Sequence, residues 1–318
     1  MSSVTSRAVG AVVGGFIADA AGLPIHWVYN QDDLNAIVAK HDKPEFIPEG
    51  HCPYYKLPTG SLSGFADQGY ALLQSLVESK GLDLDNYKSS LVTRFGPGSG
   101  YDIDRSGEKP VLGPWLNGSL KQFLANHAEK KAKTGADSAD VDSLSKVGPL
   151  VALYAGDPKL MSYVESTVRV TQDNDIAVKY AQAGAKLLED YILNGPNPDA
   201  VQKLTGQVDA DAKAEIEAVI AVKGEPHQEV AKKFGLGCGM PANFNNAIHC
   251  ILNGSDDFAA SVRFGLASGG DNCGRLSFVG SCFGAQGGFE SLPADWIAKT
   301  TEGAKLKALA EELVKMRK

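Results

Sequence analysis

The chain has 318 residues, 43% of them hydrophobic and 22% charged, which is enough apolar material for a sizeable core and excludes a disordered protein. Its formal charge of −7 and isoelectric point near 5.4 argue against nucleic acid or an anionic membrane as partner, because both need a basic surface. Five scattered cysteines without a CxxC pair argue against a disulfide framework or a zinc cage, and we expect reduced thiols and a cytoplasmic location.

The first predicted element is a helix in which small residues recur every fourth position, at Gly10, Gly14, Ala18 and Gly22. The apolar run from Ala8 to Ala18 imitates a secretion signal, but three glycines and no leucine make a poor signal core, and we expect no secretion. By its sequence pattern no apolar stretch approaches the roughly 18 residues that a membrane span needs, so we expect no membrane insertion.

The segments that follow have helical periodicity, and we find no run of strand alternation bounded by hairpin turns. Asp209 or Asp211 is placed to cap one of these helices. Polar or Gly/Pro-rich stretches at 96–110 and 126–146 are predicted loops. The periodic apolar positions are Leu72, Leu73, Leu76 and Val77; Ala181, Ala185, Leu188 and Ile192; Ile216, Val219 and Ile220; and Leu306, Leu309, Leu313 and Val314.

A second series of small residues, Gly280, Gly284 and Gly288, repeats the four-residue spacing. Glycine inside a helix costs about 1 kcal/mol relative to alanine, so two such series need a reason, and close approach of helix backbones supplies one. We therefore expect the first helix and the helix from about Cys273 to Gln286 to be central and tightly packed. Together these patterns predict an all-α, single-domain compact helical bundle over residues 1–318.

Three motifs spread over the chain carry a resemblance to ADP-ribosylglycohydrolases. The segment from Ala18 to His26 resembles the family's Gly-Asp-Ala-x-Gly-x-Pro-x-Glu opening, Phe65-Ala66-Asp67-Gln68 its Thr-Asp-Asp-Thr motif, and Gly269-Gly270-Asp271-Asn272-Cys273-Gly274 its Gly-Gly-Asp-Thr-Asp-Thr motif. The resemblance covers nearly the whole chain. It implies an all-α fold and hydrolysis of ADP-ribose through a pair of magnesium ions, which want carboxylate and hydroxyl ligands.

The family's ligands are mostly missing here. At its six ligand positions stand Phe65, Ala66, Asp67, Asp271, Cys273 and Gly274, of which only the two aspartates suit magnesium. The glutamate of the opening motif is replaced by His26, and the resemblance implies that His26, Asp19 and Asn272 line a remnant pocket. We expect no catalytic residue, no metal beyond one weakly held ion at Asp67 and Asp271, and no cofactor unless the remnant site still holds magnesium.

Each remaining residue also has a structural interpretation. Asp67 and Asp271 are placed to cap helices, and His26 beside Trp27 is more often a packed, hydrogen-bonded residue than a catalyst. Gly269-Gly270 could shape a helix start that holds phosphate without metal. Cys273, in a first helical turn near Arg275, is either an activated thiol or a small buried filler. We further predict that Phe65 occupies space near Asp271 that the family leaves for metal.

Loss of the ligands, together with the Ala-Asp-Ala-Ala…Pro-x-His-Trp opening, is similar to the family branch that contains selenoprotein J and the J-crystallins of jellyfish lenses. That resemblance implies a non-catalytic structural lens protein on a hydrolase scaffold. Two alternatives stay open: a hydrolase that removes ADP-ribose with a remodelled site, and an inactive module that still binds ADP-ribose or a nucleotide. No partner is certain, a weak ADP-ribose or phosphate ligand is possible, and we expect neither nucleic acid nor membrane.

Overall fold

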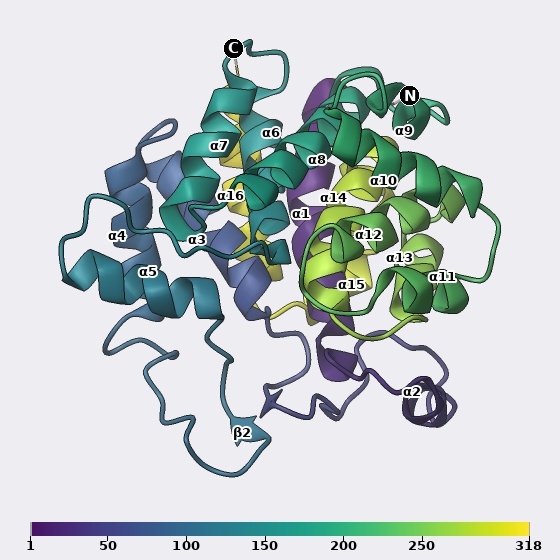
Figure 1. Cartoon of the computed structure of the whole chain (residues 1–318), viewed down its shortest axis with the longest axis horizontal. Coiled ribbons are helices and arrows are strands. Elements are labelled where there is room, and N and C mark those ends of the chain that lie inside the picture. The colour runs from purple at the N-terminus through teal and green to yellow at the C-terminus, as the bar shows by residue number, and fades with distance from the viewer. Residues whose placement is uncertain (1, 318) are drawn as a thin grey trace.

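A computed structural model describes residues 2–317, and in that range the chain is built from helices joined by loops, with two strands of two residues each (Figure 1). The predicted all-α class is confirmed. The α-helices are α1 (Val4–Gly22), α2 (Gln31–Val38), α3 (Gly64–Glu78), α4 (Leu84–Phe95), α5 (Gly118–Ala128), α6 (Val147–Tyr154), α7 (Leu160–Thr171), α8 (Asp175–Asn194), α9 (Ala200–Leu204), α10 (Ala210–Ala221), α11 (His227–Phe234), α12 (Ala242–Asn253), α13 (Phe258–Leu266), α14 (Asn272–Gly287), α15 (Ala294–Lys299) and α16 (Gly303–Lys315).

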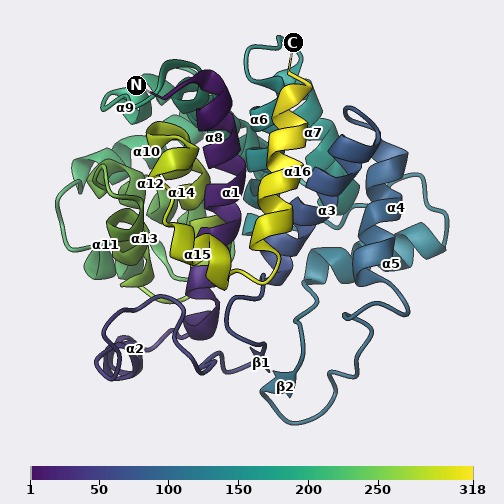
Figure 2. The ribbon, with the colours of Figure 1, turned by 180° about the vertical axis from the view of Figure 1, so that it is seen from behind.

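Shorter elements complete the chain. Three 3-10 helices, η1 (Leu23–Ile25), η2 (Val141–Lys146) and η3 (Phe289–Ser291), extend or connect the α-helices. Strands β1 (Tyr55–Lys56) and β2 (Val111–Leu112) pair in parallel, with Tyr55 opposite Val111. Sequence reasoning did not find this pair, because two residues are too few to show strand alternation. The pair ties two long loops together below the helices (Figure 2).

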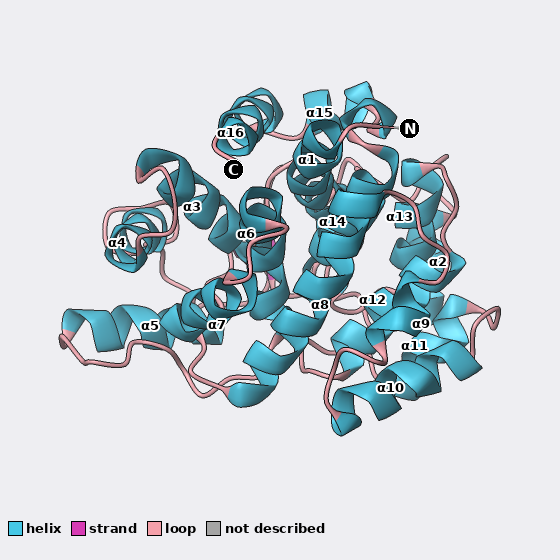
Figure 3. Cartoon of the chain, turned by 90° about the horizontal axis from the view of Figure 1, so that it is seen from above, coloured by secondary structure: helices cyan, strands magenta, loops and turns pink. Residues whose placement is uncertain are grey.

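Helices α1 and α14 lie antiparallel and side by side at the centre of the molecule (Figure 3). A Cβ added to Gly10 would lie 2.2 Å from the carbonyl oxygen of Gly284, and one added to Gly14 would lie 2.5 Å from that of Gly280. The two glycine series therefore face each other, and the prediction that these helices are central and tightly packed is confirmed. Because the helices run in opposite directions, the end of α1 and the start of α14 meet at one end of the pair.

The other helices wrap around this pair in a single continuous hydrophobic cluster that runs from Ala8 to Val314. Helices α6 and α8 cover one side, α12 and α13 another, and α16 packs against both α1 and α3 (Figure 2). In α16 the predicted apolar stripe faces inward, with Leu306 and Leu313 fully buried. Asp209 caps α10 by accepting a hydrogen bond from the Ala212 amide, as predicted.

The N-terminal helix needs one correction. The segment Val4–Ile25 is long and apolar enough to cross a membrane, so the prediction that no stretch reaches that length was wrong. Its most apolar window is entirely buried inside the protein, however, as in a core helix. Arg7, which directly precedes the apolar run, is buried and donates to the carbonyl oxygens of Ile192 and Leu193 at 2.8 Å, where it stabilises the end of α8.

Candidate functional site

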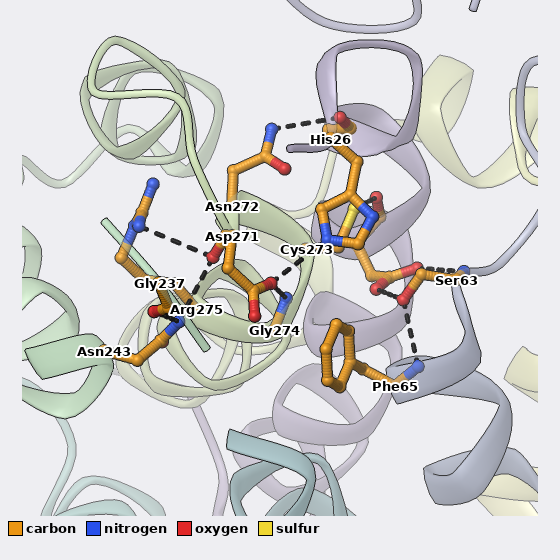
Figure 4. A network of polar contacts seen from close by, with 12 residues as sticks. His26, Ser63, Phe65, Gly237, Asn243, Asp271, Asn272, Cys273, Gly274 and Arg275 are labelled. Carbon is orange, nitrogen blue, oxygen red and sulfur yellow. Dashed lines mark hydrogen bonds and ion pairs between the residues drawn. The ribbon is translucent and has the colours of Figure 1, made fainter. Parts of the chain in front are cut away.

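The meeting point of α1 and α14 gathers most of the predicted site residues. Asp19 lies in the last turns of α1, His26 just beyond η1, Phe65 in the first turn of α3, and Asp271 to Gly274 at the start of α14. Figure 4 shows His26, Phe65, Asp271 and Cys273 close together, while the side chain of Asn272 turns away from them toward Gly22. Sequence motifs 245 residues apart are therefore joined by the close packing of the glycine series.

His26 is buried in a chain of hydrogen bonds. Its Nδ1 lies 2.7 Å from the Tyr55 hydroxyl and its Nε2 lies 3.1 Å from Oδ1 of Asp271. Burial raises the pKa of Tyr55, so its hydroxyl stays protonated and donates a hydrogen bond to Nδ1. The proton of the neutral imidazole is then on Nε2, which donates a hydrogen bond to Asp271. The imidazole stacks on Trp27 with ring centroids 4.3 Å apart, and the Phe65 ring meets it edge-on at 5.8 Å. The interpretation of His26 as a packed, hydrogen-bonded residue is confirmed.

Asp271 caps α14, as predicted. Its Oδ1 accepts a hydrogen bond from the Gly274 amide at 3.2 Å, while Oδ2 has no hydrogen-bond partner within residues 2–317. Gly269 and Gly270 precede it with φ of 65° and 63°, a left-handed conformation that other residues rarely adopt. This turn lets Gly270 exchange backbone hydrogen bonds with Trp27 and Val28. Because a carboxylate already occupies the helix start, the geometry disfavours a phosphate there.

Asp19 is fully buried and binds the start of α3. The Ser63 amide and hydroxyl donate to its two carboxylate oxygens at 2.8 Å and 2.5 Å. Ser63 in turn caps α3 by accepting from the Phe65 amide at 3.1 Å. Burial raises the pKa of Asp19 to about 8, against the opposing effect of the Ser63 hydrogen bonds. Asp19 therefore positions the helix that carries the family's first ligand motif.

Asp67 faces other partners. Its carboxylate pairs with the Arg94 guanidinium of α4 and accepts a hydrogen bond from the Tyr101 hydroxyl at 2.5 Å. Burial raises its pKa, while Arg94 acts in the opposite direction. The prediction that Asp67 caps a helix was wrong, because Ser63 holds that position. Each of the two remaining carboxylates thus already has protein partners of its own.

The residues do not fit the magnesium pair that the resemblance implies. Phe65 and Ala66 are buried and offer no oxygen, and Phe65 points its ring toward Asp271, as predicted (Figure 4). A Cβ on Gly274 would lie 2.3 Å from a methyl of Val141, so the family's threonine has no room there. Within residues 2–317 no group of three or more histidine, cysteine or acidic side chains is arranged to hold an ion.

Cys273 is a buried filler, and its interpretation as an activated thiol was wrong. The side chain is fully buried and its sulfur lies 3.5 Å from the Asp19 carbonyl oxygen. Burial, reinforced by Asp19 and Asp271, raises its pKa well above the usual value and so outweighs the helix dipole. Arg275 acts in the opposite direction but more weakly, because its guanidinium donates to the Gly265 and Gly269 carbonyls at 3.0 Å. Asn272 donates to the Gly22 carbonyl at 3.0 Å and joins the two central helices.

Sequence reasoning missed a buried polar cluster beside the site. Asp142 in η2 accepts hydrogen bonds from Gln68, from Asn117 at 2.9 Å and from Ser119 at 2.8 Å. The Lys146 ammonium donates to Gln68 at 3.1 Å, and burial lowers its pKa to about 8. Gln68, the fourth residue of the family's threonine-aspartate motif, was the one signal for this cluster. Its contacts hold α3, α5 and η2 together.

Comparison with known proteins agrees with this architecture. The sequence matches the ADP-ribosylglycohydrolase family model over residues 1–318. It is 40% identical to Crystallin J1A of Tripedalia cystophora, covering 98% of this chain and 97% of that protein, and 37% identical to Crystallin J1B of the same organism, covering 99% and 98%. A solved structure described as an ADP-ribosylglycohydrolase-related protein complex superposes with a TM-score of 0.71 over the full length of both chains, at 19% identity, which is a likeness of fold.

Proposed function

Because the chain belongs to the ADP-ribosylglycohydrolase family, we propose that it keeps that scaffold as a structural lens protein, a crystallin, and does not hydrolyse ADP-ribose. The role needs a soluble, compact and long-lived fold and no working site. We also propose that it acts in the cytoplasm of lens cells, in keeping with five free cysteines, four of them buried.

The observation that carries this proposal is that the ligand positions are filled with packing side chains. Phe65 packs edge-on against His26, Cys273 is fully buried, and the methyl of Val141 occupies the space beside Gly274. A site that had only lost its ligands would leave polar gaps, which are costly in a protein interior. Replacement by packed apolar groups supports retention of the scaffold for its stability.

The names of the similar proteins support the same proposal. Crystallin J1A and Crystallin J1B match this chain over nearly its whole length. The net charge of −7 favours solubility at the high concentrations that a lens protein must reach. Abundance gives the direct test of this part: quantitative mass spectrometry of lens extract is expected to place the chain among the major soluble proteins, and a trace amount would contradict a structural role.

One observation favours a second candidate, an inactive module that binds ADP-ribose. Oδ2 of Asp271 is buried and has no hydrogen-bond partner among the described residues, so it could accept from a ribose hydroxyl. Such a ligand would have to displace Phe65 or Trp27, because both rings pack against His26 beside that carboxylate.

Calorimetry with ADP-ribose and magnesium separates these functions. A structural protein is expected to give no saturable heat at ligand concentrations up to about 1 mM. A dissociation constant of about 1 mM corresponds to a binding free energy of about −4 kcal/mol. Binding tighter than this that is lost in Asp271→Asn, without turnover, would support the binding module. Release of ADP-ribose from a modified protein would overturn the structural proposal, and Asp256→Asn, an exposed aspartate, serves as the matched control.

A further inference from the structure

Helices α11, α12 and α13, on one side of the molecule in Figure 1, enclose a buried pair of histidines. His227 is the first residue of α11 and His249 lies in α12, and their Nδ1 atoms are 3.0 Å apart. The Phe264 ring of α13 stacks on both imidazoles, and neither histidine is more than 3% exposed. Neither belongs to the family motifs, so the site described above gives the pair no role.

The hydrogen bonds of the pair assign one proton to each imidazole. Nε2 of His249 lies 3.3 Å from the Val222 carbonyl oxygen, which can only accept, so Nε2 carries the His249 proton and Nδ1 is an acceptor. His227 then donates from its Nδ1, and its Nε2 accepts from the Cys250 thiol at 3.3 Å. Burial raises the pKa of Cys250 to about 12, so the thiol keeps the proton that it donates. This chain of hydrogen bonds uses all four ring nitrogens.

A further proton has no favourable place in this chain. On Nδ1 of His249 it would face the N–H of His227, and on Nε2 of His227 it would face the thiol proton. Rearranging the protons removes that clash but leaves a positive charge in the interior. Burial, reinforced by the positive charges of Arg275 and His249, lowers the pKa of His227 well below its ordinary value of 6.5. Burial also lowers the pKa of His249, although the Val222 carbonyl and the Glu225 carboxylate act in the opposite direction.

Helix α11 depends on this pair for its attachment to the protein. Of its eight residues only His227, Val230 and Ala231 are buried. The connection that precedes it, residues 223–226, is exposed. Few buried side chains and an exposed connection are typical of a segment that opens locally. Because water solvates a protonated imidazole and the protein interior does not, protonation of the pair favours that opening.

The segment that follows α11 lies over the start of α14. The Asp271 amide donates to the Leu236 carbonyl at 2.9 Å, and the Val141 amide donates to the Cys238 carbonyl at 2.8 Å. A Cβ added to Gly270 would lie 2.5 Å from the Leu236 carbonyl oxygen, so the segment packs directly on the glycine turn before α14. Movement of α11 would therefore loosen the cover of the remnant site.

From this arrangement we propose that the histidine pair is an acid-sensitive clamp, which holds α11 and the segment up to Met240 in place at neutral pH and releases them when acid protonates the imidazoles. The proposal does not depend on the structural role, since a crystallin and an enzyme could equally carry such a clamp. The open form binds protons with the ordinary pKa of 6.5 and the closed form excludes them, so the clamp is stable above that pH and weakens below it. Between about pH 7.5 and about pH 5.5, the equilibrium constant for opening rises about tenfold for one histidine that stays neutral when closed, and about 100-fold for two.

The test is hydrogen–deuterium exchange of the full chain, followed by mass spectrometry at these two pH values and corrected for the intrinsic pH dependence of amide exchange. After correction we expect residues 222–240 to exchange about tenfold to 100-fold faster at the lower pH, whereas α1 and α8 should change by less than about twofold. His227→Asn keeps a donor toward His249 but cannot be protonated, so it should reduce the rise about tenfold. His41→Asn, at a half-buried histidine after α2, is the matched control and should leave the rise unchanged.

NMR of the imidazole nitrogens in the wild type gives a second readout that needs no variant. Both histidines are expected to stay neutral down to the pH at which α11 opens, with their protons on Nδ1 of His227 and Nε2 of His249. Any of three results would overturn the proposal. These are protonation of either imidazole near its ordinary pKa while residues 222–240 stay protected; loss of protection throughout the chain together with α11; or the same rise in His227→Asn as in the wild type.

Discussion

The fully buried Asp19 makes the stability of the protein depend on pH in a predictable direction. Burial disfavours the carboxylate and raises the pKa of Asp19 from its ordinary value of 3.8 to about 8 in the folded chain. Between these two values the folded state holds a proton that the unfolded state has lost, so the free energy of unfolding falls as pH rises from about 4 to about 8 and levels off above that. Neutralising Asp19 should remove this part of the pH dependence.

Asp19→Asn is the change that tests this reasoning. The amide has nearly the same shape, can accept from the Ser63 amide through Oδ1 and can donate to the Ser63 hydroxyl through Nδ2. The pKa of Asp19 rises by about four on folding, and each pKa unit corresponds to about 1.4 kcal/mol. The stability that the wild type loses when Asp19 ionises is therefore at most about 6 kcal/mol. Relaxation around the ionised group makes the real cost smaller than this bound. We therefore expect the free energy of unfolding of the variant to exceed that of the wild type by about 2–5 kcal/mol near pH 8, and to match it within about 1 kcal/mol near pH 4.

Equilibrium urea unfolding followed by circular dichroism, repeated across this pH range, measures the difference. Asp256→Asn, at an exposed position, controls for the loss of one negative charge and should follow the wild-type curve. Parallel stability curves for wild type and Asp19→Asn would show that Asp19 is ionised in the folded protein and would refute the reasoning.

Three other outcomes are expected. Gly14→Ala should lower stability by about 2 kcal/mol or more, because its Cβ would lie 2.5 Å from a backbone oxygen, whereas Gly118→Ala in an open position should be neutral or slightly stabilising by thermal unfolding. Gly274→Ala should cost about 1–3 kcal/mol, and Val141→Ala should restore part of it in a double-mutant cycle; strictly additive effects would contradict the clash. Iodoacetamide should label none of the five cysteines quickly in native protein, since four are buried and burial together with Asp271 raises the pKa of the half-buried Cys238; rapid labelling of any of the buried four would contradict the packing.

Much of the fold could be predicted from local patterns. The glycine series at Gly10, Gly14, Gly280 and Gly284 indicated which helices are central, since only close backbone contact justifies glycine at those spacings. The same patterns did not reveal β1 and β2, because their pairing depends on where two long loops happen to meet.

The sequence predicted which residues form the candidate site, through the family motifs. It did not predict the residues that form hydrogen bonds or ion pairs with them. The resemblance brought His26 and Asp271 to one place, but the residues that bind the predicted ones, such as Tyr55 for His26 and Arg94 for Asp67, lie on segments placed by tertiary packing. No periodicity or spacing in the sequence reports such contacts. Cys273 was interpreted from its helix position alone, and burial, which the sequence does not record, decided its chemistry.

The antiparallel pair of α1 and α14 also has a consequence for the order of folding. Gly10 contacts Gly284, so α1 leaves the ribosome long before its main partner α14 and stays without it while the helices between them are synthesised. Contacts so distant in sequence form slowly, and until they form the apolar α1 needs protection from aggregation, by a chaperone for instance. Once α1 and α14 have packed together, unfolding should be slow, because separating the two helices disrupts the whole centre of the molecule in one step. In tissue whose proteins are seldom replaced, this slow unfolding rate would determine the lifetime of each folded molecule.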